Sequence, residues 1–79
     1  MSAPMIAYAN LSGDSGVRAY RIGARQITVR FAGGAEYVYT HASAGREHVE
    51  AMKLLARAGR GLATYISQHV HDAYAGKQP

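Results

Sequence analysis

The chain of 79 residues contains no cysteine. Disulfide bonds are therefore excluded, and so are the thiolate ligands that most structural zinc sites use. A chain of this length forms one domain, and such a small domain buries only about 60–65% of the surface that its unfolded form exposes. Small domains often gain stability from a disulfide, a metal or a partner chain. Because the first of these is excluded, we keep a partner chain as a hypothesis.

Segments that direct a protein to a membrane are missing as well. The opening residues Met1-Ser2-Ala3-Pro4 have neither the basic region nor the long apolar run of a signal peptide. No apolar stretch approaches the roughly 20 residues that a membrane-spanning helix needs. We expect a soluble, cytoplasmic protein that has no membrane partner.

The sequence carries no catalytic or metal-binding signature. Its four histidines are His41, His48, His69 and His71. The last two are separated by about 200° around a helix, so they cannot both reach one metal ion. His69 falls on an apolar helical stripe, and we interpret it as a histidine at the edge of the core that bonds to a backbone group. No serine lies in a nucleophile elbow, although Ser43, His41 and Glu36 are all present. From these observations together we predict no catalytic residue, no metal, no cofactor and no enzymatic activity.

What the chain has instead is an excess of positive charge. Its formal net charge is +4, and seven of its nine basic residues are arginine, the side chain that makes planar, bidentate contacts with phosphate. The excess is uneven, because residues 17–40 carry a net charge of +3 and residues 46–60 carry +2. This distribution favours an anionic partner, although a solvated surface that keeps a small protein soluble explains it equally well.

The first half of the chain has the pattern of β-strands. Residues 27–31 alternate β-branched or aromatic side chains with polar ones, which is the clearest strand pattern in the chain. Residues 35–40 follow as a return strand after the Gly33-Gly34 turn, and residues 17–22 form a first strand. The sequence predicts a three-stranded antiparallel sheet, a β-meander. Residues 5–8 can add a strand or lie against the core, and we leave them unassigned.

The hairpin at Gly33-Gly34 allows two registers. A two-residue loop puts Tyr37 and Tyr39 on the same face as the arginines, whereas a three-residue loop with Gly34 in a G1 bulge pairs Val29 with Tyr37 and Ile27 with Tyr39. A slip of one residue moves every side chain to the other face. We favour the second register, because it gives a small domain one continuous apolar face that includes both tyrosines.

The second half has the pattern of two amphipathic helices. Ser43 can cap a first helix that runs to about Ala58, where Gly59 ends it. From Leu62 to Tyr74 apolar residues recur at helical spacing, which predicts a second helix. The predicted fold is therefore α+β, a three-stranded antiparallel sheet followed by a two-helix hairpin that packs on one face. We expect one core that contains Val29, Phe31, Tyr37, Ile66 and Val70.

Several of these residues follow the pattern of one known family. The run Ile27-x-Val29-x-Phe31, then Gly34, then Tyr37-x-Tyr39, resembles the KTSC domain, whose central mark is a tyrosine-x-tyrosine motif. Tyr20 fits the upstream tyrosine of that family. The pattern Ala58-Gly59-x-Gly61-Leu62, followed by Ile66, Val70 and Tyr74, is similar to its C-terminal helix region. The family occurs at the C-terminus of some lysyl-tRNA synthetases and as free-standing small bacterial proteins.

The resemblance implies a shared fold and suggests RNA binding, and it offers no catalytic residue to carry over. It covers roughly residues 15–74. We therefore expect an N-terminal extension over residues 1–16 that is flexible or loosely packed, a single KTSC-like domain over residues 17–75, and a C-terminal tail over residues 76–79.

Two functions remain open at this point. The sequence Gly59-Arg60-Gly61 resembles a fragment of a phosphate-binding loop before a helix, or is a plain turn between helices. Arginines combined with tyrosines are typical of proteins that bind single strands. We predict a non-enzymatic module that binds nucleic acid, RNA or another polyanion, through Arg18, Arg30, Arg57 and Arg60. The alternative is a protein-interaction or self-association module, a homodimer formed by helix packing or by strand pairing at an open edge along residues 17–22.

Overall fold

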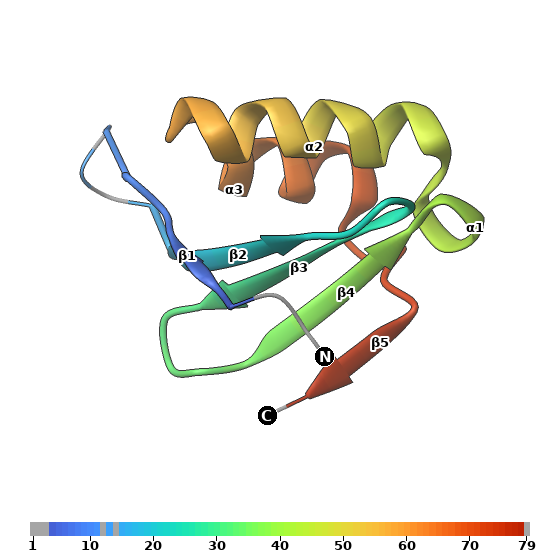
Figure 1. Ribbon diagram of the computed structural model, residues 1–79, viewed down its shortest axis with the longest axis horizontal. Helices are drawn as coiled ribbons and strands as arrows, with labels where there is room; N and C mark the ends of the chain where they lie inside the picture. The colour runs from blue at the N-terminus through green and yellow to red at the C-terminus, as the bar shows by residue number, and fades with distance from the viewer. Residues whose placement is uncertain (1–3, 12, 14, 79) are drawn as a thin grey trace.

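The computed structural model describes residues 4–11, 13 and 15–78 and arranges them in two layers, a β-sheet and a layer of helices on one of its faces (Figure 1). The sheet is five-stranded and antiparallel. Its strands, in spatial order, are β1 (Ile6–Ala7), β2 (Val17–Ile22), β3 (Gln26–Phe31), β4 (Glu36–Thr40) and β5 (Gly76–Gln78). The helices are inserted between β4 and β5. The predicted α+β class is confirmed, whereas the predicted number of three strands is wrong.

Two short outer strands account for the difference. In β1, Ile6 pairs with Tyr20 and Ala7 pairs with Ala19, and β5 pairs with β4 along residues 76–78. Both outer strands lie in segments that we expected to be an extension and a tail. β2 therefore has a neighbour on each side, which corrects the expected open edge along residues 17–22.

The β3–β4 hairpin adopts the favoured register. Val29 pairs with Tyr37 and Ile27 pairs with Tyr39, so both tyrosines lie on the face that the helices cover. The loop closes through a bond from the Gly34 N–H to the Phe31 carbonyl, at 3.0 Å. Gly34 has a φ of +97°, in the left-handed region that side chains disfavour, and this is why the turn needs glycine.

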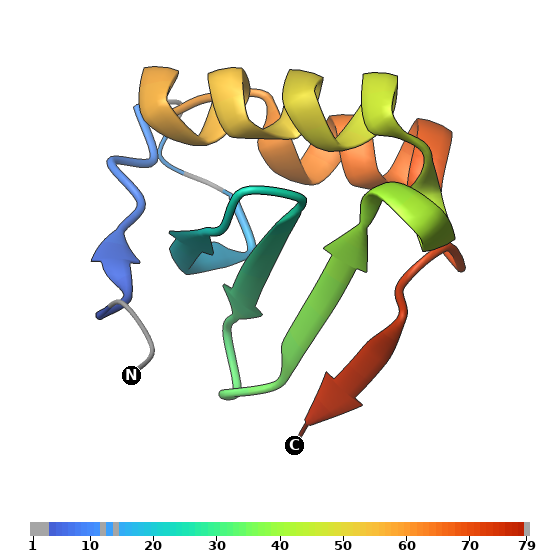
Figure 2. The same cartoon turned by 45° about the vertical axis from the view of Figure 1, so that its right-hand side comes forward.

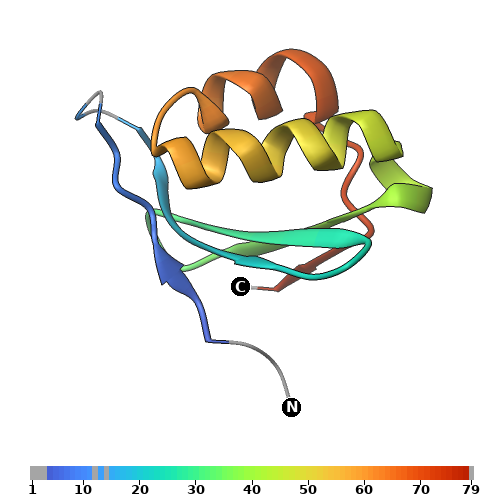
Figure 3. The ribbon, with the colours of Figure 1, turned by 45° about the horizontal axis from the view of Figure 1, so that its top comes forward.

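The helical layer is a hairpin of two long segments with one extra turn before it (Figures 2 and 3). Its elements are α1 (His41–Ala44), α2 (Arg46–Ala58), α3 (Leu62–Tyr65) and the π-helical turn η1 (Ile66–Val70). Thr40, and not the predicted Ser43, is the N-cap of α1, and the two residues form a reciprocal capping box with bonds of 3.0 Å in each direction. Gly45 then interrupts the helix with a φ of +98° before α2 begins.

The second segment is shorter than its apolar spacing predicts. α3 continues directly into η1, which ends at Val70, so Tyr74 lies in the connection to β5 and not on a helix. The wider π-turn changes the phase of the helix, and such turns recur at functional sites. No helix in the described part of the chain is long and apolar enough to cross a membrane.

The core lies between α2, α3–η1 and the inner strands. Its largest fully buried side chains are Tyr39, Ile27, Met52, Leu62, Val17, Val29, Val49 and Val70. Of the five predicted core residues, Val29, Ile66 and Val70 are buried, whereas Phe31 and Tyr37 are only half-buried and pack against the margin of the core. The helical layer thus leaves part of the aromatic surface of β3 and β4 uncovered.

Candidate functional site

A groove with a volume of about 420 Å³ opens where the helical layer leaves that surface uncovered. It runs between the hairpin end of the sheet and the α3–η1 segment, and its aromatic lining consists of Phe31, Tyr37, Tyr39 and Tyr74. The first three share one face because they alternate along paired strands. Tyr74 joins them from the connection between η1 and β5, because η1 already ends at Val70.

The four rings form one continuous aromatic surface. Edge-to-face contacts link Phe31 to Tyr37, with ring centroids 5.4 Å apart, and Tyr37 to Tyr74, at 4.9 Å. Tyr39 meets Tyr74 at 6.4 Å. Burial, with smaller contributions from the neighbouring phenols, raises the pKa of Tyr39 to about 12, so this ring is a neutral floor. Tyr74 is the most exposed of the four and forms the rim.

Polar groups also border the aromatic surface. Ser67, His71 and Asp72 line the groove there. His71 Nδ1 lies 2.9 Å from Asp72 Oδ1, and both side chains are largely exposed. Lys77 of β5 holds its ammonium group 5.3 Å from the centre of the Tyr37 ring, within the range of a cation–π contact.

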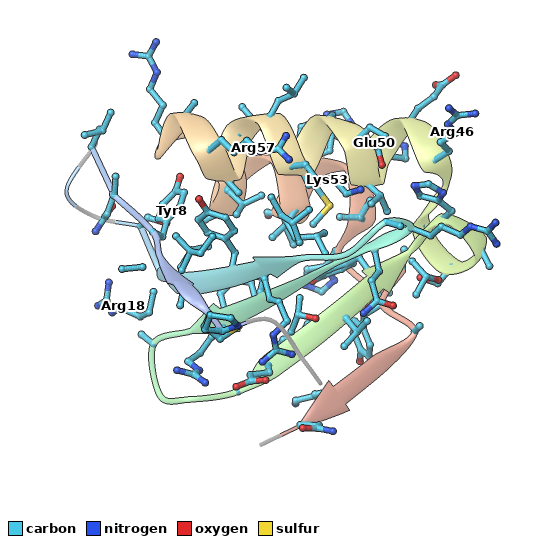
Figure 4. All side chains as sticks on the ribbon, in the orientation of Figure 1. Tyr8, Arg18, Arg46, Glu50, Lys53 and Arg57 are labelled. Atoms are coloured by element: carbon cyan, nitrogen blue, oxygen red, sulfur yellow. The ribbon has the colours of Figure 1, made fainter. Side chains whose placement is uncertain are left out.

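Two of the four predicted arginines lie on segments that neighbour groove-lining residues, although neither lines the groove itself. Arg18 follows Val17, which pairs with the groove residue Phe31, and its exposed side chain lies beside the β3–β4 hairpin in Figure 4. Arg60 is exposed in the turn between α2 and α3, one helical turn before Ala63, which also lines the groove.

The other two predicted arginines lie elsewhere. Arg30 is on the opposite face of the sheet, where its Nε and Nη2 donate to Glu36 Oε2 at 3.0 and 2.7 Å. This ion pair between neighbouring strands occupies the planar edge that would bind phosphate. Arg57 is exposed on α2 and shares a helical stripe with Lys53 and Glu50 (Figure 4).

The Gly59-Arg60-Gly61 turn is held by the N-terminal segment. The Leu11 N–H donates to the Gly59 carbonyl at 2.8 Å, and the Leu62 N–H donates to the Tyr8 hydroxyl at 3.3 Å. The first helical N–H group is therefore already occupied, and α3 itself has only four residues. This geometry favours the plain turn over the phosphate-loop interpretation. Tyr8 carries no motif that marks it in the sequence, although the apolar run at residues 5–8 indicates that this segment packs.

Lys53 and Glu50 belong to the structure of the helical layer. Lys53 is buried, and its Nζ donates to the Ala24 carbonyl at 3.2 Å and pairs with Glu50 Oε2 at 2.8 Å. His41 Nε2 lies 2.9 Å from the same carboxylate oxygen. The hydrogen bonds from Lys53 and His41 lower the pKa of Glu50 to about 2. This cluster fastens α2 to the β2–β3 turn and removes one cation from the exposed basic surface.

A second cluster joins α2 to the α3–η1 segment. His48 Nδ1 lies 2.7 Å from the Tyr65 hydroxyl, and the His69 ring packs on Tyr65 with centroids 4.4 Å apart. His69 is exposed, which corrects its interpretation as a residue at the edge of the core. Within residues 4–11, 13 and 15–78, no group of three or more histidine or acidic side chains could hold a metal ion.

Comparison with known proteins finds no match for this chain among protein-family models, curated proteins or solved structures. The resemblance to the KTSC domain therefore stays a prediction, and the candidate site is interpreted from its own geometry.

Proposed function

We propose that this chain is a non-enzymatic module that binds single-stranded RNA, with unpaired bases in the aromatic groove and phosphates on the arginines beside it. The observation that carries the proposal is the groove itself, in which partly exposed aromatic rings line a hollow on a protein with a net charge of +4. Proteins that bind single strands combine these two features.

The aromatic surface suits bases. Phe31 and Tyr37 are half-buried and Tyr74 is exposed, so their rings are fixed by packing and still reach solvent. Stacking of a base on an aromatic side chain contributes about 1–3 kcal/mol and is available to every base. Because duplex bases are already stacked and paired, the groove favours a single strand over a double strand.

The cations suit the backbone of the same strand. Arg18 and Arg60 are exposed, and no ion-pair partner for either is found among the described residues. Arg57 extends the positive surface along α2. Arg30 contributes least, because its guanidinium group is bound to Glu36. With three phosphate contacts, the logarithm of affinity should fall with the logarithm of salt concentration at a slope of about −2.

Self-association is the second candidate, and one observation favours it. Leu54 on α2 and Leu11 in the N-terminal segment are exposed to 66% and 68%. Exposed large apolar side chains are common singly, but they can also mark a surface that a second copy covers. A dimer of this kind would form by helix packing, because β1 already pairs with β2.

Fluorescence polarisation with a labelled single-stranded RNA of about 12 nucleotides tests the proposal at salt concentrations between about 50 and 200 mM. We expect binding at low salt that weakens with the slope given above. The Tyr74→Leu variant keeps an apolar side chain and loses the ring, so we expect it to bind about tenfold more weakly. Tyr65→Leu is the matched control, because Tyr65 lies outside the groove and packs on His69. No binding at the lowest salt would contradict the proposal, and a concentration-dependent dimer in sedimentation would then favour self-association.

A further inference from the structure

One carboxylate lies in the lining of the groove. Asp72 is the one acidic residue among the groove-lining side chains in the described part of the chain, and this lining includes no lysine or arginine. His71 Nδ1 contacts one of its carboxylate oxygens, Oδ1, at 2.9 Å. The contact leaves Oδ2 with no protein partner among the described residues. A ligand in the groove therefore meets a hydrogen-bond acceptor.

An ionised carboxylate only accepts hydrogen bonds, and it repels phosphate. The part of an RNA strand that lies beside Asp72 must therefore be a donor group on a base. Cytosine presents an exocyclic amino group at N4, which is the group that Asp and Glu accept from when proteins recognise this base. Uracil carries a carbonyl oxygen at the same position, and its one N–H lies between two carbonyl oxygens that the carboxylate repels.

We infer that the groove selects bases that carry an exocyclic amino group, cytosine over uracil, through Asp72. This inference rests on the proposed function and adds specificity to the same site. The two pyrimidines have the same size and stack similarly on Tyr37 and Tyr74, so stacking does not separate them. Discrimination comes from the hydrogen bond that cytosine makes and uracil cannot. At an exposed rim such a bond should give cytosine about a threefold to tenfold tighter affinity.

Polarisation titrations of labelled oligocytidine and oligouridine of equal length, at one low salt concentration and near neutral pH, test the inference. We expect oligocytidine to bind about threefold to tenfold more tightly to the wild-type protein. Asp72→Asn should bring the two affinities together, because the amide offers both a donor and an acceptor to either base. Glu47→Gln on the exposed surface of α2 is the matched control for the loss of one negative charge, and it should keep the preference.

The outcomes separate the inference from the function on which it rests. Equal affinities in the wild-type protein, or a preference that persists in Asp72→Asn, would overturn the inference and leave RNA binding in place. Failure of both oligonucleotides to bind would overturn the proposed function and the inference with it. A labelled lysine-rich peptide provides the alternative probe, since aromatic rings beside a carboxylate also suit cations. If that peptide binds, loses affinity in Asp72→Asn, and neither oligonucleotide binds, the groove is a site for basic side chains.

Discussion

The hydroxyl group of Tyr8 accepts a hydrogen bond from the backbone N–H of Leu62, which is 54 residues further along the chain. The bond is buried and joins the segment after β1 to the start of α3. It satisfies an N–H group at a helix start, where backbone donors have no partner inside the helix. The N-terminal segment is thus a structural part of the domain.

Replacing Tyr8 by phenylalanine should lower the free energy of unfolding by about 1–3 kcal/mol, because the variant leaves the buried Leu62 N–H without its acceptor. Urea denaturation followed by circular dichroism measures the change. Tyr74→Phe removes a hydroxyl group from the exposed rim of the groove and should change stability little. Equal midpoints for the Tyr8→Phe variant and the wild-type protein would show that the bond contributes nothing.

The contact between Gly59 and the N-terminal segment can be tested separately. Gly59 has a φ of +78°, and a Cβ atom placed there would lie 2.6 Å from the Cβ of Ala9. Gly61 has nearly the same φ, +80°, but a Cβ there would meet only Leu55 at an ordinary 3.6 Å. Both alanine variants carry the left-handed strain of about 1–2 kcal/mol, so the additional loss in Gly59→Ala measures the contact. Thermal melts that coincide for the two variants would place Ala9 away from Gly59.

The pH dependence of stability should contain a contribution from Glu50. Its pKa is lowered from the ordinary value of 4.5 to about 2, first by the hydrogen bond from Lys53 and then by that from His41. A carboxyl whose folded-state pKa is depressed stabilises the fold fully above its unfolded pKa and loses this contribution as the pH falls through the folded pKa. The difference in stability between wild type and Glu50→Gln should therefore shrink as the pH falls from 4.5 toward 2. A denaturation series across this range measures the trend, and Glu47→Gln, on the exposed surface of α2, is the matched control for the loss of one carboxyl group.

The salt dependence of RNA binding should identify the phosphate contacts. Replacing Arg18 and Arg60 together by alanine should make the slope of log affinity against log salt shallower by about 1.4, since each contact to a single strand contributes about 0.7. The fold should be unchanged, because both side chains are exposed. Arg25→Ala with Arg46→Ala removes the same charge from other exposed positions. An equal effect of the two double variants would mean that only net charge matters.

Sequence patterns predicted the inner part of the fold and missed its margins. The register of β3 and β4 followed from period-two alternation and from two adjacent glycines, because only one register places Tyr37 and Tyr39 on the apolar face. β1 and β5 have two and three residues, which is too short for any alternation to be recognised. Their pairing depends on the tertiary structure around them.

The groove could not be predicted for a related reason. Apolar residues recur at helical spacing as far as Tyr74, so the sequence predicted a helix that would cover Tyr37. The π-turn and the end of η1 at Val70 depend on packing, and they leave Tyr37 half-covered with Tyr74 beside it. Three of the four predicted arginines are exposed as expected, but their spacing in sequence did not indicate that Arg30 pairs with Glu36 on the opposite face. Asp72 carried no signal at all, since a single acidic residue in a helical pattern is ordinary.

The brevity of β1 and β5 also bears on how the protein behaves when it is crowded. A long, flat outer strand presents a row of unpaired backbone groups on which another chain can add, and repeated addition leads to fibrils. Here the outer strands offer only two and three residues, Pro4 stands just before the first with no N–H to donate, and Lys77 places a charge in the second. Both outer strands are therefore poor templates for the addition of a strand from another chain. In this way the fold limits amyloid-like growth of its sheet and needs no covering helix or loop to do so.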